Sequence, residues 1–416
     1  MFQLSRLFKT EYRHFQKLSP DAQKLFFSSA IYALANPLLF VFTNAFILRQ
    51  TNSFFLVGIY NLGYFITLPL TFLLNGALLK HIQMKHLFLI GLLGQGLVVT
   101  LIFFWHQPII TSLLLLGGLQ GVPLGLYWAN RNFITVAVTH DQERTYYCSL
   151  ETILNSIASI IVPITFGWFI VFGGYSRLYS AQSAYQILII IVLCLLFLAG
   201  YLFQSTTLSN PIITQLLITH PDKAWWYSRI SEFFRGFMDR TVEFFPPLLV
   251  FNFLGKEGVL GTAQSAMAVF GMIVIYLIGR KTQTHHRLLV LGTAAGIFAV
   301  ASLLFAVNFT AWSALVLILI LGLVDQLTWV THNPIQQKAV DLADGGDTQH
   351  NYAYITDREA FLNIGRVIAM FSFFYLITLS QTTALRFTPL VVAISQVALW
   401  LFTALLVKEL KKNGKN

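Results

Sequence analysis

The feature that most limits how this chain can fold is a series of long apolar segments spread along its whole length. A helix needs roughly 20 apolar residues to cross a bilayer, and several segments approach that length: Leu87–Trp105, Ile187–Phe203, Leu288–Val307 and Val391–Val407. Strands of a membrane β-barrel would be about half as long and would alternate between apolar and polar residues. The segments therefore predict an all-α polytopic membrane protein.

The composition supports this prediction. Hydrophobic residues make up 56% of the chain and charged residues 11%, against about 25% charged residues in a soluble domain. We predict twelve transmembrane helices, at residues 25–48, 54–79, 86–105, 109–131, 146–172, 181–204, 227–253, 258–279, 288–308, 311–334, 352–378 and 387–407. The polar connector Gln204–Lys223 divides them six plus six.

The formal charge of +10 follows from topology and does not indicate nucleic-acid binding. With a cytoplasmic N-terminus, four of the 27 Lys and Arg residues fall in external loops and four within spans, which leaves 27 − 4 − 4 = 19 in cytoplasmic segments. This distribution is the positive-inside pattern. We expect a multi-pass protein of the plasma (inner) membrane with both termini cytoplasmic, surrounded by the lipid bilayer and without a nucleic-acid partner.

Two stretches about two hundred residues apart resemble each other. Gly125–Asn132 (GLYWANRN) is echoed by Gln326–Asn333 (QLTWVTHN), and Glu151–Asn155 is echoed by Glu359–Asn363. A chain that is apolar throughout and duplicated at half its length predicts two similar bundles that face each other across a substrate path. The repeat therefore indicates a transporter built from two pseudo-symmetric six-helix bundles.

The expected organisation follows from these boundaries. It comprises a cytoplasmic or interfacial segment (1–24), an N-terminal six-helix bundle (25–204), a cytoplasmic linker (205–226), a C-terminal six-helix bundle (227–407) and a cytoplasmic tail (408–416). Only two cysteines occur, and neither metal-binding spacing nor a phosphate-binding GxxxxGK loop is present. We therefore expect no cofactor, no metal and no direct use of ATP.

Twelve spans in two repeated halves, with cytoplasmic ends and a polar central loop, resemble the major facilitator superfamily over nearly the whole chain. The loop after span two keeps Gly76 and Lys80 of that family's Gly…Asp…Gly-Arg pattern but lacks the aspartate. Arg131 ends span four and Glu143-Arg144 opens span five, as in the family. The signature at 127–132 (YWANRN) is similar to that of incompletely characterised bacterial transporters. The resemblance implies a transporter and not an enzyme.

Charged side chains inside spans are costly unless they are paired or face water. In span seven, Glu232, Arg235, Asp239 and Glu243 recur at intervals of three and four residues, so we predict that they share one helical face. Such a stripe must face the bundle interior or a water-filled cavity. One interpretation makes Asp239 or Glu243 a proton-coupling carboxylate, and the alternative is a structural ladder of ion pairs.

Asp325 lies about halfway along span ten and has no acidic counterpart in the first half. A lone aspartate in the middle of the membrane is a candidate proton carrier, because a buried carboxylate can exchange a proton. The alternative is a permanent ion pair with Arg366 or Arg240. Both interpretations remain open at the level of sequence.

The repeated polar residues end spans four and ten and open spans five and eleven. We interpret them as a cytoplasmic gate closed by salt bridges between spans four or five and spans ten or eleven. The candidates are Arg131, Asn132, Glu151, Asn155, Asn333, Arg358, Glu359, Asn363 and Arg366. In the alternative the contacts stay within each half, so that Arg131 binds Glu151 and either Arg358 or Lys338 binds Glu359. A third interpretation is that these residues contact the substrate directly.

Candidates for the substrate cavity are Asn36, Tyr127, Trp128, Arg240, Gln326 and Trp329. Aromatic rings could stack on a ring or sugar, although aromatics near span ends more often anchor a helix at the membrane interface. Asn36-Pro37 in span one and Phe245-Pro246-Pro247 in span seven predict breaks in helical hydrogen bonding. Asn44, Asn61 and Asn75 add neutral polarity to the first half.

These observations lead to one function and two alternatives. The leading hypothesis is a secondary active transporter of a small molecule that works by alternating access and is coupled to protons. A lipid or glycolipid flippase on the same scaffold is the alternative. A polytopic membrane enzyme is more remote, because the loops are too short for a catalytic constellation. We expect the protein to be a monomer.

Overall fold

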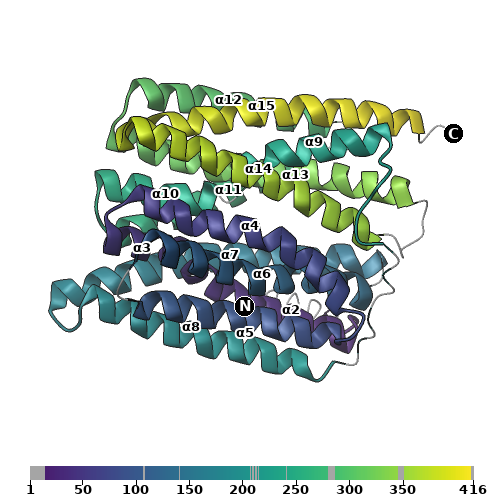
Figure 1. Cartoon of the computed structure of the whole chain (residues 1–416), viewed down its shortest axis with the longest axis horizontal. Helices are drawn as coiled ribbons and strands as arrows, with labels where there is room; N and C mark the ends of the chain where they lie inside the picture. Colours follow the sequence, from purple (N-terminus) through teal and green to yellow (C-terminus); the bar gives the residue numbers. More distant parts are fainter. Residues whose placement is uncertain are drawn as a thin grey trace, which may run out of the picture.

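The computed structural model describes residues 15–413 except 106–107, 140, 207, 209, 211–212, 214, 240, 280–285 and 345–350. Within them the fold is all-helical (Figure 1). The first half contains α2 (Pro20–Pro37), η1 (Leu38–Phe42), α3 (Thr43–Thr51), α4 (Phe54–Leu78), α5 (Met84–Phe104), α6 (Ile110–Val138), α7 (Asp141–Ser176) and α8 (Ala181–Gln204). The second half contains α9 (Lys223–Met238), α10 (Thr241–Phe253), α11 (Glu257–Gly279), α12 (Arg287–Val307), α13 (Ala311–Asp344), α14 (Asn351–Leu379) and α15 (Gln381–Asn413).

The predicted multi-pass architecture is confirmed. Among the described residues, 11 helical segments are long and apolar enough to cross a membrane, with α2, η1 and α3 counted together. The span predicted at 227–253 is divided, because α9 ends at Met238 and α10 begins at Thr241. Several helices extend beyond their predicted ends, and α13 continues through Pro334. Its last turns pack into a small apolar cluster around Trp225, Ile335 and Leu406, which stabilises the extension.

Helix starts follow from side-chain caps. Ser19 accepts a hydrogen bond from the Ala22 N–H at 3.1 Å, and Pro20 occupies the first turn of α2. Asp222 caps α9 in the same way, accepting from the Trp225 N–H at 2.7 Å. Such oxygen acceptors satisfy amide groups that have no partner within the first turn. The polar connector between the halves therefore ends where Asp222 begins the second bundle.

Span one widens after its proline. Pro37 has no N–H to donate to the preceding turn, and the next five residues, Leu38–Phe42, form a π-helical turn. Thr43 Oγ1 donates to the Leu38 carbonyl oxygen at 2.7 Å, which supports the wider turn. The break predicted at Asn36-Pro37 is therefore a local widening and not an interruption of the helix.

Span seven breaks at a different place from the one predicted. The helix α10 runs through Pro246 and Pro247, whereas the chain leaves helical geometry at Asp239, where φ is −58° and ψ is 137°. A proline removes the hydrogen bond to the carbonyl four residues earlier and crowds that carbonyl. For these two prolines the carbonyls belong to Val242 and Glu243, in the first turn of α10, so the disturbance falls where a new helix begins.

The two halves form two layers of helices (Figure 1). Across the boundary, α7 packs against α11 and α4 packs against α14. The α7–α11 contact is close, since a Cβ added at Gly261 would lie 2.0 Å from the Pro163 carbonyl oxygen. We call the end where α8 ends and α9 begins the linker end, and the end where α3 ends and α11 begins the opposite end.

Candidate functional site

A small polar pocket lies between the two halves. Its lining residues are Phe40, Asn44, Tyr60, Asn61, Tyr64 and Gln120 from the first half and Glu243 from the second. Asn61 Nδ2 donates to Asn44 Oδ1 at 2.8 Å and to the Val57 carbonyl oxygen at 2.8 Å. These two bonds use both Nδ2 hydrogens, so the Asn61 side chain can offer only its carbonyl oxygen to a further partner. We call this the central pocket.

Glycines on α6 bring the pocket residues together. A Cβ at Gly117 would lie 1.9 Å from the Tyr60 carbonyl oxygen, and one at Gly121 would lie 2.6 Å from the Tyr64 carbonyl oxygen. Glycine at every fourth position lets two helix backbones touch. The stripe therefore presses α6 onto α4 and holds Gln120, which lies between the two glycines, beside Asn61.

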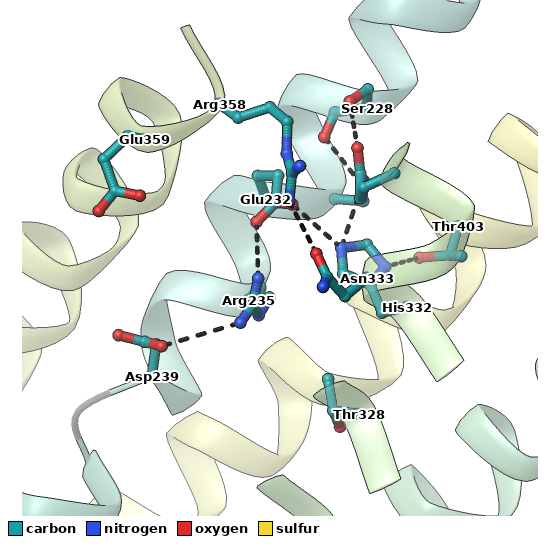
Figure 2. Close-up of polar contacts among 12 residues, drawn as sticks. Ser228, Glu232, Arg235, Asp239, Thr328, His332, Asn333, Arg358, Glu359 and Thr403 are labelled. Atoms are coloured by element: carbon teal, nitrogen blue, oxygen red, sulfur yellow. Dashed lines mark hydrogen bonds and ion pairs between the residues drawn. The ribbon is translucent and has the colours of Figure 1, made fainter. Parts of the chain in front are cut away.

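An ion-pair network occupies the second half and is centred on Glu232, which is 1% exposed (Figure 2). Arg358 of α14 donates to Glu232 Oε1 from Nε at 3.1 Å and from Nη2 at 2.8 Å. Arg235 Nη1 lies 3.4 Å from Glu232 Oε2, and His332 Nε2 of α13 lies 3.6 Å from Oε1. Arg358 also reaches Asn333 Oδ1 at 3.4 Å. Three helices thus meet at one carboxylate.

Hydrogen bonds around His332 assign its tautomer. Thr403 Oγ1 donates its hydrogen to the Leu399 carbonyl oxygen at 2.7 Å, so at 3.2 Å from His332 Nδ1 it can only accept. Gln336 Nε2 donates to Ser231 at 2.7 Å and lies 3.2 Å from His332 Nε2. A neutral ring with its hydrogen on Nδ1 satisfies the Thr403 and Gln336 contacts and leaves Nε2 without a hydrogen to donate to Glu232, so the ion pairs of Glu232 are those with Arg358 and Arg235. This part of the network is complete without a ligand.

A second cluster lies at the break of span seven. Arg366 of α14 donates from Nε to Asp239 Oδ2 at 2.8 Å, and Arg235 Nη2 lies 4.0 Å from Asp239 Oδ1. Arg366 Nη1 also donates to Glu359 Oε1 at 3.2 Å and to Asn363 Oδ1 at 2.7 Å. Arg235 therefore joins this cluster to the Glu232 cluster.

A mostly apolar cavity adjoins the Asp239–Arg366 ion pair. Its other lining residues include Phe65 of α4 and Phe237, Phe244, Met370, Phe373, Leu376 and Val392 of the second half. The cavity thus lies beside the helix break and combines one ion pair with aromatic and aliphatic walls. An apolar chain could be accommodated against such walls.

The first half carries a smaller version of the ionic arrangement. Arg131 forms an ion pair with Glu151, and its guanidinium lies 5.1 Å from the centre of the Trp128 ring. In the second half the guanidinium of Arg235 lies 5.0 Å from the centre of the Trp329 ring. Each of the two repeated tryptophans therefore has an arginine guanidinium over its ring. The arginine comes from α6 in the first half and from α9 in the second.

Most gate candidates contact partners within their own half. Arg131 contacts Glu151, and Arg358 contacts Glu232. The expectation that Arg358 or Lys338 would hold Glu359 is wrong, because Arg366 on the same helix reaches it instead. Among the described residues, no ion pair joins spans four or five to spans ten or eleven, and the cytoplasmic gate stays a prediction.

The prediction of one charged stripe along span seven is wrong for Glu243. The break at Asp239 interrupts the helical repeat, so the spacing of four residues no longer places the two carboxylates on one face. Asp239 stays with Arg366 in the C-terminal bundle, whereas Glu243 lines the central pocket with Gln120. The predicted stripe is therefore divided. Asp239 forms an ion pair within the second half, whereas Glu243 lines the pocket between the halves.

Asp325 lies partly buried on α13. The described partners of the Arg366 guanidinium are Asp239, Glu359 and Asn363, so its predicted pairing with Asp325 stays a prediction. Arg235 lies within electrostatic range of Asp325. The other predicted partner, Arg240, lies outside the described residues, as does its candidacy for the substrate cavity.

The remaining cavity and gate candidates lie away from the central pocket. Tyr127 is buried and stacks on Tyr32 with ring centroids 4.2 Å apart, while Gln326 packs against Gly271 of α11. Trp329 is 54% exposed, and the guanidinium of Arg235 lies over its ring. The polar candidates Asn36 and Asn132 are partly exposed and Asn155 is exposed.

Sequence reasoning missed Gln120. Its side chain is 1% exposed, and neither Oε1 nor Nε2 has a hydrogen-bond partner among the described residues. The available signal was a glutamine inside the glycine run Gly117–Gly121 of an otherwise apolar span. Glycines that allow close helix contact, with one polar residue between them, indicate a polar group held against a neighbouring helix.

The two halves also meet at both ends. At the opposite end Arg49 of α3 forms an ion pair with Glu257 of α11, and among ion pairs between described residues only this one joins the halves. At the linker end Tyr352 Oη donates to the Phe72 carbonyl oxygen at 2.5 Å. Its ring stacks on Phe133 with centroids 4.9 Å apart.

Comparisons with known proteins agree with this architecture. Residues 25–346 match the sequence model of the Major Facilitator Superfamily. The chain is 24% identical over 356 residues to the uncharacterized protein YqgE of Bacillus subtilis (strain 168). This match covers 84% of this chain and 81% of that protein. It is 31% identical over 188 residues to an uncharacterized protein in the sodM 3′ region of Geobacillus stearothermophilus, covering 41% of this chain and 86% of that protein.

Solved structures share the fold at low sequence identity. The crystal structure of a D-xylose-proton symporter has a TM-score of 0.69 and 11% identity, and the match covers 92% of this chain and 96% of that one. The transporter FucP in its outward conformation has a TM-score of 0.56 and 16% identity, with coverage of 92% and 98%. These likenesses confirm the two-bundle fold.

Proposed function

Since this chain belongs to the Major Facilitator Superfamily and is a transmembrane transporter, we propose that it is a secondary active transporter that carries a small molecule by alternating access and uses protons as the driving ion. The observation that carries the proposal is the central pocket, in which Gln120 and Asn61 of one half and Glu243 of the other line the same space. A ligand there would contact both halves at once. Rocking of the halves could then expose it to one side at a time.

The three candidate carboxylates differ in their position relative to the central pocket. Asp239 is bound to Arg366 and lies near Arg235 at the end of α9. Glu243 lines the central pocket itself, where it could respond directly to a bound solute. We therefore propose Glu243 as the primary proton site and Asp325 as a second. The D-xylose-proton symporter, which shares this fold, supports protons as the driving ion.

Alternating access assigns roles to the two ends. With cytoplasmic termini, as the positive-inside pattern predicts, the linker end is the cytoplasmic end. The Arg49–Glu257 ion pair holds the halves together at the opposite end. In the other state, the gate candidates at the linker end would exchange their partners within each half for partners across it. Charge reversal at Glu151 or Glu359 should therefore change the balance between states.

The apolar cavity beside the helix break favours a second candidate function. Its walls are mainly aromatic and aliphatic, and it reaches the Asp239–Arg366 ion pair. A lipid or glycolipid could place an acyl chain there and a polar headgroup at the ion pair. This alternative predicts transport of a lipid analogue and no response to soluble solutes.

The test begins with a thermal-shift screen of the purified protein against metabolites, lipid headgroups and drugs at two pH values. A compound that raises the melting temperature becomes the transport probe. In proteoliposomes with an internal pH dye, that probe should move protons in the wild type, and both Glu243→Gln and Asp325→Asn should stop this movement while the protein stays folded.

The matched control for these variants is Glu409→Gln. Glu409 pairs with Lys412 near the end of α15, far along the chain from the pocket, so its loss should leave proton movement unchanged. Proton movement at wild-type rate in both Glu243→Gln and Asp325→Asn would refute proton coupling through these carboxylates.

A further inference from the structure

We propose that Gln120 is the specificity-determining contact of the central pocket and recognises an uncharged solute that presents a hydrogen-bond donor and an acceptor on adjacent atoms. The inference rests on the proposed function, because it describes the transported molecule. Two sources share this chemistry, namely vicinal hydroxyl groups and the N–H/C=O edge of an amide.

The first argument is that Gln120 is a buried amide without a partner. Both of its side-chain polar atoms lack a hydrogen bond among the described residues, at 1% exposure. Gln95, which is 0% exposed, shows the usual situation. Its Oε1 accepts from Tyr32 Oη at 2.9 Å, and its Nε2 donates to the Gly91 carbonyl oxygen at 3.0 Å. A buried polar group without a partner destabilises the folded chain, so the amide of Gln120 lies here at a cost to stability.

The second argument is that packing does not require a glutamine here. The repeat that places Trp128 over Trp329 has an offset of 201 residues, and it places Gln120 over Leu321, since 120 + 201 = 321. Leu321 is 2% exposed in the equivalent span of the second half. The duplicated frame therefore accommodates an apolar side chain at this position, and the amide of Gln120 is an addition to that frame.

The third argument is that Gln120 cannot turn away from the pocket by moving its helix. The glycines on either side of it hold α6 in backbone contact with α4, since a Cβ at Gly117 or Gly121 would overlap with α4 carbonyl oxygens. The amide therefore stays beside Asn61 in the pocket lining. A polar group fixed in this way is pre-organised for a ligand.

The chemistry of the pocket selects the ligand. A glutamine amide presents an acceptor and a donor side by side and pairs in a bidentate manner with a complementary edge. The other polar groups that line the pocket are the Asn44 and Asn61 amides, tyrosine hydroxyls and the proposed proton site Glu243. Among the described residues of this lining there is one carboxylate and no cation, so an anionic solute is disfavoured. The rings of Phe40 and Tyr60 can cover apolar faces of the ligand.

The first test separates a ligand-binding role from a structural one through the melting temperature of the ligand-free protein. Gln120→Leu removes an unpartnered amide and should leave the melting temperature unchanged or raise it. The matched variant Gln95→Leu should lower it, because Tyr32 loses its acceptor. A loss in Gln120→Leu as large as that in Gln95→Leu would show that Gln120 is structural and would overturn the proposal.

The second test measures binding of named probes to the purified full-length protein. Xylitol and myo-inositol represent vicinal hydroxyls, with gluconate as their anionic counterpart. Uracil and nicotinamide represent the amide edge, with orotate as their anionic counterpart. We expect one uncharged pair to bind the wild type saturably and its anionic counterpart to bind at least tenfold more weakly. Gln120→Leu should weaken binding of the same pair by at least about tenfold, or about 1.4 kcal/mol.

Three results would overturn the inference. They are equal binding by wild type and Gln120→Leu, preferential binding of the anionic counterparts, and no binding of any uncharged probe up to about 10 mM, which exceeds the usual range of KM. The proposed function fails separately, through the proton measurement. Probe-driven proton movement that is lost in Glu243→Gln but unaffected by Gln120→Leu would leave the transporter proposal standing and refute the role of Gln120.

Discussion

The two halves share a helical frame but differ in the polarity that they bury. Both halves bury amides, such as the Asn61–Asn44 pair and Gln120 in the first and Gln336 in the second, but the first half buries only the separate Arg131–Glu151 ion pair among its described residues. The second half buries arginines and carboxylates that are linked across three helices through Glu232 and Arg235. A duplicated scaffold has thus acquired a linked ionic network in its second half, whereas its first half buries one separate ion pair among the described residues.

The offset between the halves shows that the charges are not part of the duplicated frame. Pro37-Leu-Leu and Pro247-Leu-Leu are related by 210 residues, so Glu232, Arg235 and Asp239 fall on Ala22, Leu25 and Ser29. By contrast, Glu151 and Glu359 are both ion-paired, and both repeated tryptophans carry an arginine. The shared residues hold each bundle together, and those found in one half alone point to what that half does.

The largest effect should come from the centre of the ionic network. Glu232→Gln leaves Arg358 and Arg235 buried without their shared carboxylate, and unpairing a buried charge costs about 3–5 kcal/mol. Glu151→Gln removes the partner of one arginine, which keeps its contact with Trp128, so a smaller loss of about 1–3 kcal/mol is expected. Chemical unfolding in detergent measures both. Equal losses would remove the energetic distinction between the halves.

An intermediate effect should separate two glycines that the repeat relates. A Cβ at Gly121 would overlap with the backbone of α4, which cannot yield, so Gly121→Ala should cost about 1–3 kcal/mol. A Cβ at Gly322 would meet the Met267 side chain, which can adjust. Gly322→Ala should therefore lower the melting temperature less. The reverse order would show that close α6–α4 packing does not position the central pocket.

The smallest effect should come from the ion pair that joins the halves. Arg49 is exposed. Exposed ion pairs contribute about 0.2–1 kcal/mol, which corresponds to a change of up to roughly fivefold in the population of two states. Arg49→Gln should therefore favour separation of the halves at the opposite end. Spin labels at Asn52→Cys and Asn308→Cys, with the native cysteines replaced, would report longer distances.

The control for this variant is Lys24→Gln. Lys24 pairs with Asp21 within the first half, so its loss removes an ion pair without affecting the contact between halves. Distance distributions that change equally in both variants would assign no gating role to Arg49.

Much of the fold could be predicted from sequence because the bilayer sets the length of an apolar helix. The helix α8, predicted at 181–204, has these bounds. Span seven could not be predicted in the same way, because the prolines at 246–247 mark a disturbance without stating where the helix restarts. The break lies at Asp239, whose side chain is bound by Arg366 of a helix distant in sequence.

The candidate site was less predictable, for a physical reason. Ionic residues such as Glu232 and Asp239 stand out in an apolar sequence because burying a charge is costly. A single glutamine is a weak signal, since its significance depends on whether a partner lies near it in the folded chain. Gln95 and Gln120 look alike in sequence, and only the structure shows that one is bonded and the other is not.

The most direct test of this division between the halves compares exchange with accumulation in proteoliposomes, using a probe that binds the wild type. Exchange of labelled for unlabelled probe needs binding and alternating access but no net proton movement, whereas accumulation against a gradient needs proton coupling. We predict that Glu243→Gln keeps exchange and loses accumulation driven by a pH gradient, while Gln120→Leu loses both. Accumulation at wild-type level in Glu243→Gln, or unimpaired exchange in Gln120→Leu, would contradict the account.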